Sequence, residues 1–192
     1  NAETNHRSEI TADGKILVIG NKGVSITGSQ VKGAKDGYVQ ADQGGIKIDN
    51  AMSTTTTKID ERTGVVFNIT GSAHKANNRD EKIIGSELAS DANLKIISKD
   101  NVDVIGSMIA SAGELGIETL GEVNVKAAQA QQKIDEQKSK LTISGFTSDD
   151  GNNQYQAGLK LNHSSESEKT DSIKNHAASL QGGTVKLDAQ KD

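Results

Sequence analysis

The sequence predicts an all-β protein: a right-handed parallel β-helix (β-solenoid) of coils of about 20 residues, with β-hairpin excursions. Three observations predict this fold. Residues Gly85–Ser90 return 21 positions later as Gly106–Ser111, and a larger unit returns after 78 residues. Apolar and polar residues alternate in short runs bounded by Gly, Asn and Asp, as in short strands. The chain also contains no proline and only 2% aromatic residues, whereas about ten prolines would be average for this length.

The coils are expected at about 8–52, 85–128 and 178–192 of a single solenoid fragment spanning 1–192. In each coil a Gly-Ser pair would mark a tight corner and an apolar residue such as Leu88 or Ile109 would point inward. Such self-similarity at a fixed period is typical of repeat architectures. The recurring apolar pairs are Ile16/Val18 with Leu94/Ile96, Val24/Ile26 with Val102/Val104, and Ile46/Ile48 with Val123/Val125.

The composition suits a coil whose strands pair with the coils above and below, about 4.8 Å apart. Inward residues then stack in a thin column, in which large aromatic side chains are hard to accommodate. A proline would remove a backbone donor from the ladder. Turns are expected where residues adopt left-handed backbone at low cost, namely at Gly23, Gly45, Gly113, Gly121 and Asp100-Asn101.

Two polar excursions, about 53–84 and 129–177, separate the coils and are predicted to be β-hairpins that pack beside them. They are related, because the tetrapeptide KIDE occurs at Lys58–Glu61 and again at Lys133–Glu136. Strands are predicted at Val66–Ile69 and Leu141–Ile143, and a hairpin at Gly145–Asn162 with its turn at Asp150–Asn152. The Ala, Gln and Lys residues of Ala127–Lys140 have good helix propensity, so a short helix there is the alternative.

The motif Gly85-Ser86-x-Leu88-Ala89-Ser90, then Leu94-x-Ile96, then Asn101–Ala128 resembles the haemagglutinin repeats of filamentous haemagglutinin-type two-partner-secretion exoproteins. The alternation of a coil pair with a long polar excursion is most similar to the second repeat region of contact-dependent growth-inhibition toxins. The resemblance covers nearly the whole chain. The first residues, NAETNHRSE, read as the middle of a longer protein.

The resemblance implies a non-catalytic segment of a secreted, filamentous protein on the surface of a Gram-negative cell. Its partners would be an outer-membrane two-partner-secretion transporter during export and the outer membrane or a surface receptor of a target cell. The segment would contribute to target-cell engagement and toxin delivery in growth inhibition. The alternative is an adhesin stalk that binds host cells or glycans. The absence of cysteine and proline suits export of an unfolded chain, because neither disulfides nor slow prolyl isomerisation would interfere.

Other function classes find little support in the sequence. The formal net charge is −4 and no Lys/Arg run stands out, so no nucleic-acid partner is expected. A polysaccharide-cleaving enzyme would need paired carboxylates in one cleft. Asp149 and Asp150 read instead as a solvated turn, and Asp60-Glu61 and Asp135-Glu136 recur as structural positions do. We therefore expect no enzyme activity, no catalytic residues and no cofactor.

No metal site is expected either. The four histidines have no partner at helical spacing, and Gly44–Asp49 lacks the third glycine of the calcium-binding nonapeptide. The threonines of Thr54–Thr57 occur once, whereas ice-binding solenoids repeat such threonines on every coil. The histidines are His6, His74, His163 and His176.

Recognition is expected in the two excursions, since loops on a rigid scaffold commonly carry function. The opposing interpretation is that the excursions only cover the flank of the coil and block lateral strand pairing. The coil ends would expose unpaired strands, so self-stacking of fragments through these ends is also expected.

Overall fold

The computed structural model describes residues 2–65, 70–149 and 155–191, and their regular structure is entirely β. The residues fall into two compact units. The coil unit comprises 2–54, 81–130 and the residues from 173 onward, and the hairpin unit comprises 55–80 and 131–172. The all-β class is confirmed. No helix that could cross a membrane occurs among the described residues.

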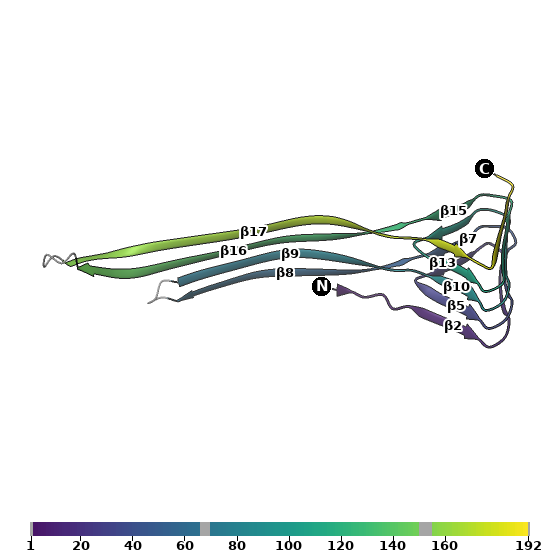
Figure 1. Cartoon of the computed structure of the whole chain (residues 1–192), viewed down its shortest axis with the longest axis horizontal. Coiled ribbons are helices and arrows are strands. Elements are labelled where there is room, and N and C mark those ends of the chain that lie inside the picture. The colour runs from purple at the N-terminus through teal and green to yellow at the C-terminus, as the bar shows by residue number, and fades with distance from the viewer. Residues whose placement is uncertain (1, 66–69, 150–154, 192) are drawn as a thin grey trace. The chain divides into compact units, whose positions relative to one another are not determined.

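The coil unit contains three parallel sheets, and each circuit of the chain adds one strand to each sheet in turn (Figure 1). The first sheet holds β2 (Ser8–Ala12), β5 (Ser29–Gly33), β10 (Glu87–Ser90), β13 (Met108–Ser111) and β18 (Ser179–Gln181). The second holds β3 (Ile16–Gly20), β6 (Gly37–Ala41), β11 (Leu94–Ser98), β14 (Glu114–Thr119) and β19 (Thr184–Ala189). The third holds β4 (Val24–Thr27), β7 (Ile46–Asp49), β12 (Val102–Ile105) and β15 (Val123–Lys126).

The core of the coil unit consists of stacked apolar columns. Leu88 pairs with Val31 on one side and with Ile109 on the other, and all three side chains are buried. Each pairing joins positions that the repeats relate, so the predicted 21-residue circuit and the inward positions of Leu88 and Ile109 are confirmed. The largest fully buried apolar side chains are Val39, Ile46, Ile48, Leu88, Leu94, Ile96, Val102, Val104, Ile109, Leu115 and Ile117.

Buried hydroxyl groups fill the corners between the sheets. The Ser90 hydroxyl bonds to the Lys35 carbonyl at 2.7 Å, and the Ser111 hydroxyl bonds to the Ala92 carbonyl at 2.7 Å. At the next corner the Ser98 hydroxyl bonds to the carbonyl of Gly44 at 3.1 Å. An unpaired buried carbonyl costs free energy, so a small hydroxyl side chain at each corner stabilises the turn of the neighbouring coil. This explains why small polar residues recur with the coil.

Two kinds of glycine serve the turns. Gly28 and Gly106 close the corner from the third sheet to the first with φ of 55° and 51°, which an L-side chain rarely adopts. Gly113 and Gly121 have no such backbone; a Cβ there would overlap the side-chain oxygens of asparagines in the neighbouring coil. Left-handed backbone was expected at Gly23, Gly45, Gly113 and Gly121. Gly23 has a positive φ of 147°, which confirms the expectation there. For the other three this reason is wrong, because close approach between coils is what requires glycine.

A fourth sheet has the order β1-β8-β9-β16-β17 and holds the long strands (Figure 1). Its middle pair, β9 and β16, is antiparallel. The alternative of a helix over 127–140 is wrong, because β16 begins at Ala128. The strands of the sheet are β1 (Ala2–Glu3), β8 (Ala51–Val65), β9 (Thr70–Ile84), β16 (Ala128–Asp149) and β17 (Tyr155–His176).

The predicted strand at Leu141–Ile143 lies within β16 and is confirmed. The predicted strand at Val66–Ile69 and the predicted turn at Asp150–Asn152 lie outside the described residues. The right hand of the coil, the packing of the hairpins beside it and the single-fragment organisation stay predictions.

Candidate functional site

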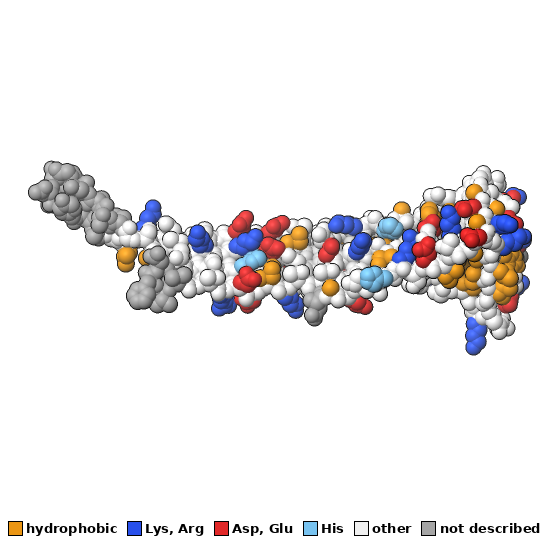
Figure 2. All heavy atoms as spheres, turned by 90° about the horizontal axis from the view of Figure 1, so that it is seen from below, with side chains coloured by type: hydrophobic (Ala, Val, Ile, Leu, Met, Phe, Trp, Pro, Cys, Tyr) orange, Lys and Arg blue, Asp and Glu red, His pale blue; other side chains and the backbone are white. Residues whose placement is uncertain are grey.

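The hairpin unit is a sheet with two polar faces. Among residues 55–64, 70–80, 131–145 and 158–172 of this unit, Ala76 is the only apolar side chain that is buried. Figure 2 shows charged side chains of both signs along these strands, whereas hydrophobic side chains gather on the coil unit. A β-sheet normally buries at least one face on a core. The exposed faces of the hairpin unit therefore form the candidate recognition surface.

A polar cluster joins β9 to β16 within this unit. The Asn78 side-chain amide donates to the Glu136 carboxylate at 2.8 Å, and its carbonyl accepts from the backbone N–H of Asp135 at 3.1 Å. The ladder pairs Lys133 with Arg79 and Glu136 with Ala76. Register is weakly specified in strands with two polar faces, so Asn78 supplies a specific contact that holds the two hairpins in register.

The Glu136 carboxylate also faces the side chains of Lys138 and His74. Lys138 Nζ lies 3.5 Å and His74 Nε2 3.8 Å from Glu136 Oε2. The hydrogen bond from Asn78 is the main cause that lowers the pKa of Glu136, and Lys138 and His74 act in the same direction. The cluster thus holds a charged carboxylate at neutral pH, an arrangement that orders the strands.

Shallow hollows lie on both faces of the hairpin unit. One hollow of about 430 Å³ is lined by small and charged side chains of β9, β16 and β17. It is open to solvent, and its lining combines hydroxyl and charged groups with aliphatic carbon. Its lining residues are Ser72, Ala73, His74, Lys138, Ser139, Lys140, Ser164, Ser165 and Glu166.

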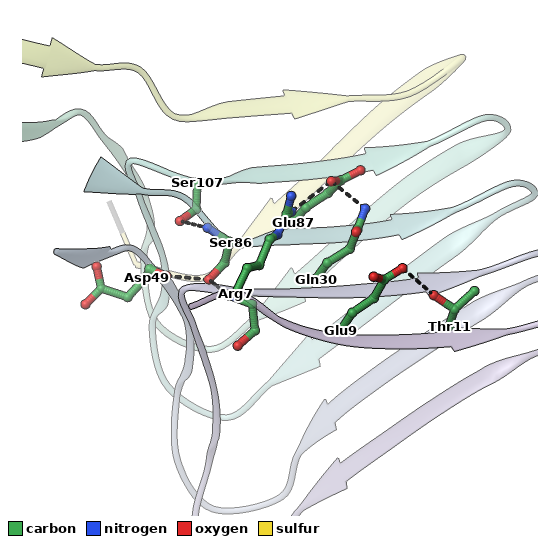
Figure 3. A network of polar contacts seen from close by, with 9 residues as sticks. Arg7, Glu9, Thr11, Gln30, Asp49, Ser86, Glu87 and Ser107 are labelled. Atoms are coloured by element: carbon green, nitrogen blue, oxygen red, sulfur yellow. Dashed lines mark hydrogen bonds and ion pairs between the residues drawn. The ribbon is translucent and has the colours of Figure 1, made fainter. Parts of the chain in front are cut away.

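A second polar cluster lies on the first sheet of the coil unit (Figure 3). Glu87 Oε2 accepts from Gln30 at 2.8 Å and forms an ion pair with Arg7 at 2.9 Å. Beside it, the Ser29 N–H donates to the Ser86 hydroxyl at 3.2 Å, and the Ser86 N–H donates to the Ser107 hydroxyl at 3.0 Å. The hydrogen bonds run between successive coils and the Arg7–Glu87 pair reaches across the intervening strand β5, so this cluster stabilises the stack.

The acidic pairs considered in the sequence lie in separate places. Asp60 is exposed and lies 3.6 Å from Arg62. Glu136 belongs to the cluster with Asn78, and the backbone N–H of the adjacent Asp135 is bonded there. Asp149 ends β16, and Asp150 lies outside the described residues.

The histidines are likewise dispersed. His6, His163 and His176 are exposed, and His74 is half-buried beside Glu136. No group of three His, Asp or Glu side chains among the described residues could hold a metal ion. The glycine-rich run at 44–49 forms a turn and strand β7, in which Ile46 and Ile48 belong to the core, and the threonines at 54–57 lie in β8.

Sequence reasoning missed Asn78 and its contact with Glu136. The KIDE motif, which ends at Glu136, was the one available signal, but the sequence offers no reason to pair it with an asparagine 58 residues away. The contact depends on which hairpin strands are neighbours, and both strands are polar around Asn78 and Glu136.

Comparison of the sequence with known proteins identifies its family. Residues 67–192 match the family model described as Hemagglutinin repeat. A protein named Hemolysin from Serratia marcescens is 52% identical over 191 residues, and one of the same name from Proteus mirabilis is 44% identical over 190. Each alignment covers 99% of this chain and 12% of the relative. No solved structure matches the chain. The sequence-based expectation of a haemagglutinin repeat is confirmed, and the chain belongs to the hemagglutinin-repeat family.

Proposed function

We propose that the chain is a non-catalytic repeat segment of a secreted two-partner exoprotein, and that its hairpin unit engages the surface of a target cell. The family and the two hemolysin relatives support a segment of a secreted or cell-surface exoprotein. One observation carries the recognition role: the hairpin unit is mostly polar, and nearly all of its described side chains are at least partly open to solvent. The residues of the coil columns, by contrast, are buried in the core and not accessible to a partner.

The coil unit is a right-handed parallel β-helix in this proposal, and it folds coil by coil as an outer-membrane transporter exports the chain. The stacked register supports this, because each new circuit pairs only with the one before it. A cysteine pair at Glu87 and Met108 tests it, since neighbouring parallel strands bring Cα atoms within disulfide range. Export should stop under oxidising conditions and return with reductant, whereas each single cysteine should export normally. Unchanged export of the oxidised pair would contradict the proposal.

The whole exoprotein is proposed to damage its target cell. The name of both relatives, Hemolysin, supports lysis of host cells as the effector activity. The repeat pattern favours a second candidate for the effector activity, namely delivery of a toxin in contact-dependent growth inhibition. Assays of red-cell lysis and of contact killing of bacteria, made on the same full-length exoprotein, distinguish the two. Adhesion to host cells without damage would favour the adhesin alternative.

Removal of one hairpin tests the recognition role. Deleting residues 50–84 joins Asp49 to Gly85-Ser86 and leaves Glu87 six residues after Ile46, the spacing that Val102 and Met108 have at the closed corner around Gly106. The coil register is thereby kept. We expect normal secretion with at least tenfold weaker binding to target cells. Secretion and binding both equal to the parent would refute a recognition role for this hairpin and leave the covering role.

A further inference from the structure

Strands of the fourth sheet leave and re-enter the coil unit at one corner. The closed corners at Gly28 and Gly106 lie directly against Ala51 and Ala128, the first residues of β8 and β16, with no room for a Cβ between them. Successive coils and neighbouring strands of a sheet share a spacing of about 4.8 Å. Strands that begin at successive levels of this corner are therefore already spaced as neighbours in a sheet.

Strands that enter and leave the same pair of coils lie side by side at two places in the fourth sheet. The end of β9, which enters one coil pair, lies beside the start of β16, which leaves that pair, with Asp80 opposite Gln132. The short strand β1 enters the preceding coil pair and lies beside β8, which leaves it. There the Asn5 amide donates to the Met52 carbonyl, and the Ser53 hydroxyl donates to the Glu3 carbonyl at 2.9 Å. An entering strand thus pairs with the strand that leaves two coils later.

The third entering strand, β17, has β16 as its one neighbour among the described residues. It leads into β18 and β19, which continue the first and second sheets. The strand is 22 residues long and contains no proline. Natural proteins usually shorten, bend or cover such an edge, because unpaired N–H and C=O groups recruit further strands.

We propose that the free edge of β17 is the docking site for the outgoing strand of the next hairpin of the same polypeptide. The occupant follows from the pairing rule, and relatives of which this chain spans 12% have room for many such units. The coil registers equate Ser172 with Asp80 and Ser164 with Ser72. Successive hairpins would then form one continuous antiparallel sheet along the exoprotein, a surface that grows with every coil pair.

Adjacent proline substitutions in the full-length exoprotein test the proposal. Successive N–H groups of a strand point to opposite neighbours, so S164P and S165P each remove a donor on a different side of β17. A docked strand loses a ladder bond in both variants, whereas a free edge tolerates one of them. We expect both to speed proteolysis within the hairpin at least tenfold. The matched pair S72P and A73P in β9, which has two neighbours, should behave alike. Acceleration by only one β17 variant would overturn the proposal.

Amide hydrogen exchange of the unaltered exoprotein gives a second measurement, independent of whether the variants are exported. A peptide covering residues 164–172 should protect nearly all its amides, whereas a free edge would leave about half of them unprotected. The protection should not change on hundredfold dilution. Half protection, or protection that is lost on dilution because a second molecule supplies the strand, would refute docking within one polypeptide.

Discussion

Replacing Gly106 by alanine should destabilise the coil unit strongly. The φ of 51° at this closed corner costs a non-glycine residue about 1–2 kcal/mol. The new Cβ would overlap that of Ala128 and lie 3.3 Å from its backbone N, so the start of β16 must shift. Overpacking of this kind costs about 1–3 kcal/mol. The expected loss in the free energy of unfolding is therefore about 2–5 kcal/mol, which urea denaturation of the parent and variant chains would measure.

Two further variants separate the causes. In G106A/A128G the overlap is relieved and the backbone strain remains, so part of the loss should return. The matched control is Gly116→Ala, where φ is ordinary and the nearest atom to the new Cβ is 4.0 Å away. This change should be neutral or stabilise by about 0.5 kcal/mol, because glycine is unfavourable within a strand. A stability of G106A within about 0.5 kcal/mol of the parent, or equal effects of G106A and G116A, would refute the reasoning.

The remaining predictions concern the core, a corner hydroxyl and the hairpin cluster. Ile96→Ala should lower the free energy of unfolding by about 2–5 kcal/mol, because the side chain is fully buried. The control Leu159→Ala, at an 80% exposed position, should change the free energy of unfolding by less than about 0.5 kcal/mol. Equal losses in the two variants would contradict the burial argument. Ser90→Ala should cost about 1–3 kcal/mol in the same assay, since buried backbone groups lose their hydroxyl partner; a neutral result would mean that these groups find other partners. The lowered pKa of Glu136 implies stability that is present above its ordinary value of 4.5 and lost as the pH falls below it. Asn78→Ala should therefore reduce the stability of the β9–β16 pairing at pH 7, measured by hydrogen exchange, and flatten its decline between pH 5 and 3; an unchanged decline would exclude Asn78 as the cause.

The coil could be predicted because its physics leaves a periodic trace in the sequence. Inward residues stack on their equivalents, so Leu88 and Ile109 must both be apolar and must be one circuit apart. The buried corner hydroxyls leave a second trace at the same spacing. For three of the turn glycines the position was right and the reason wrong, since Gly45, Gly113 and Gly121 are needed for close approach to a neighbouring coil.

The hairpins were predicted as strands, yet their partners were not. The pairing of Val24 with Ile46 can be predicted because both are apolar and half-buried or buried. β9 and β16 are mostly polar, and their few apolar residues form no column that would favour one register. The role of Asn78 could not be predicted, because its partner Glu136 lies on a neighbouring strand that the sequence does not identify.

The sequence by itself therefore determined the all-β class, the 21-residue circuit, the inward columns and the membership of a repeat family. Each of these depends on a residue resembling its own equivalent, which a single chain displays. The tertiary structure alone decided that β9 lies beside β16, that Asn78 meets Glu136 and that β17 presents an open edge. Those contacts join segments that share no repeat position, so no recurring residue pattern in the chain indicates them.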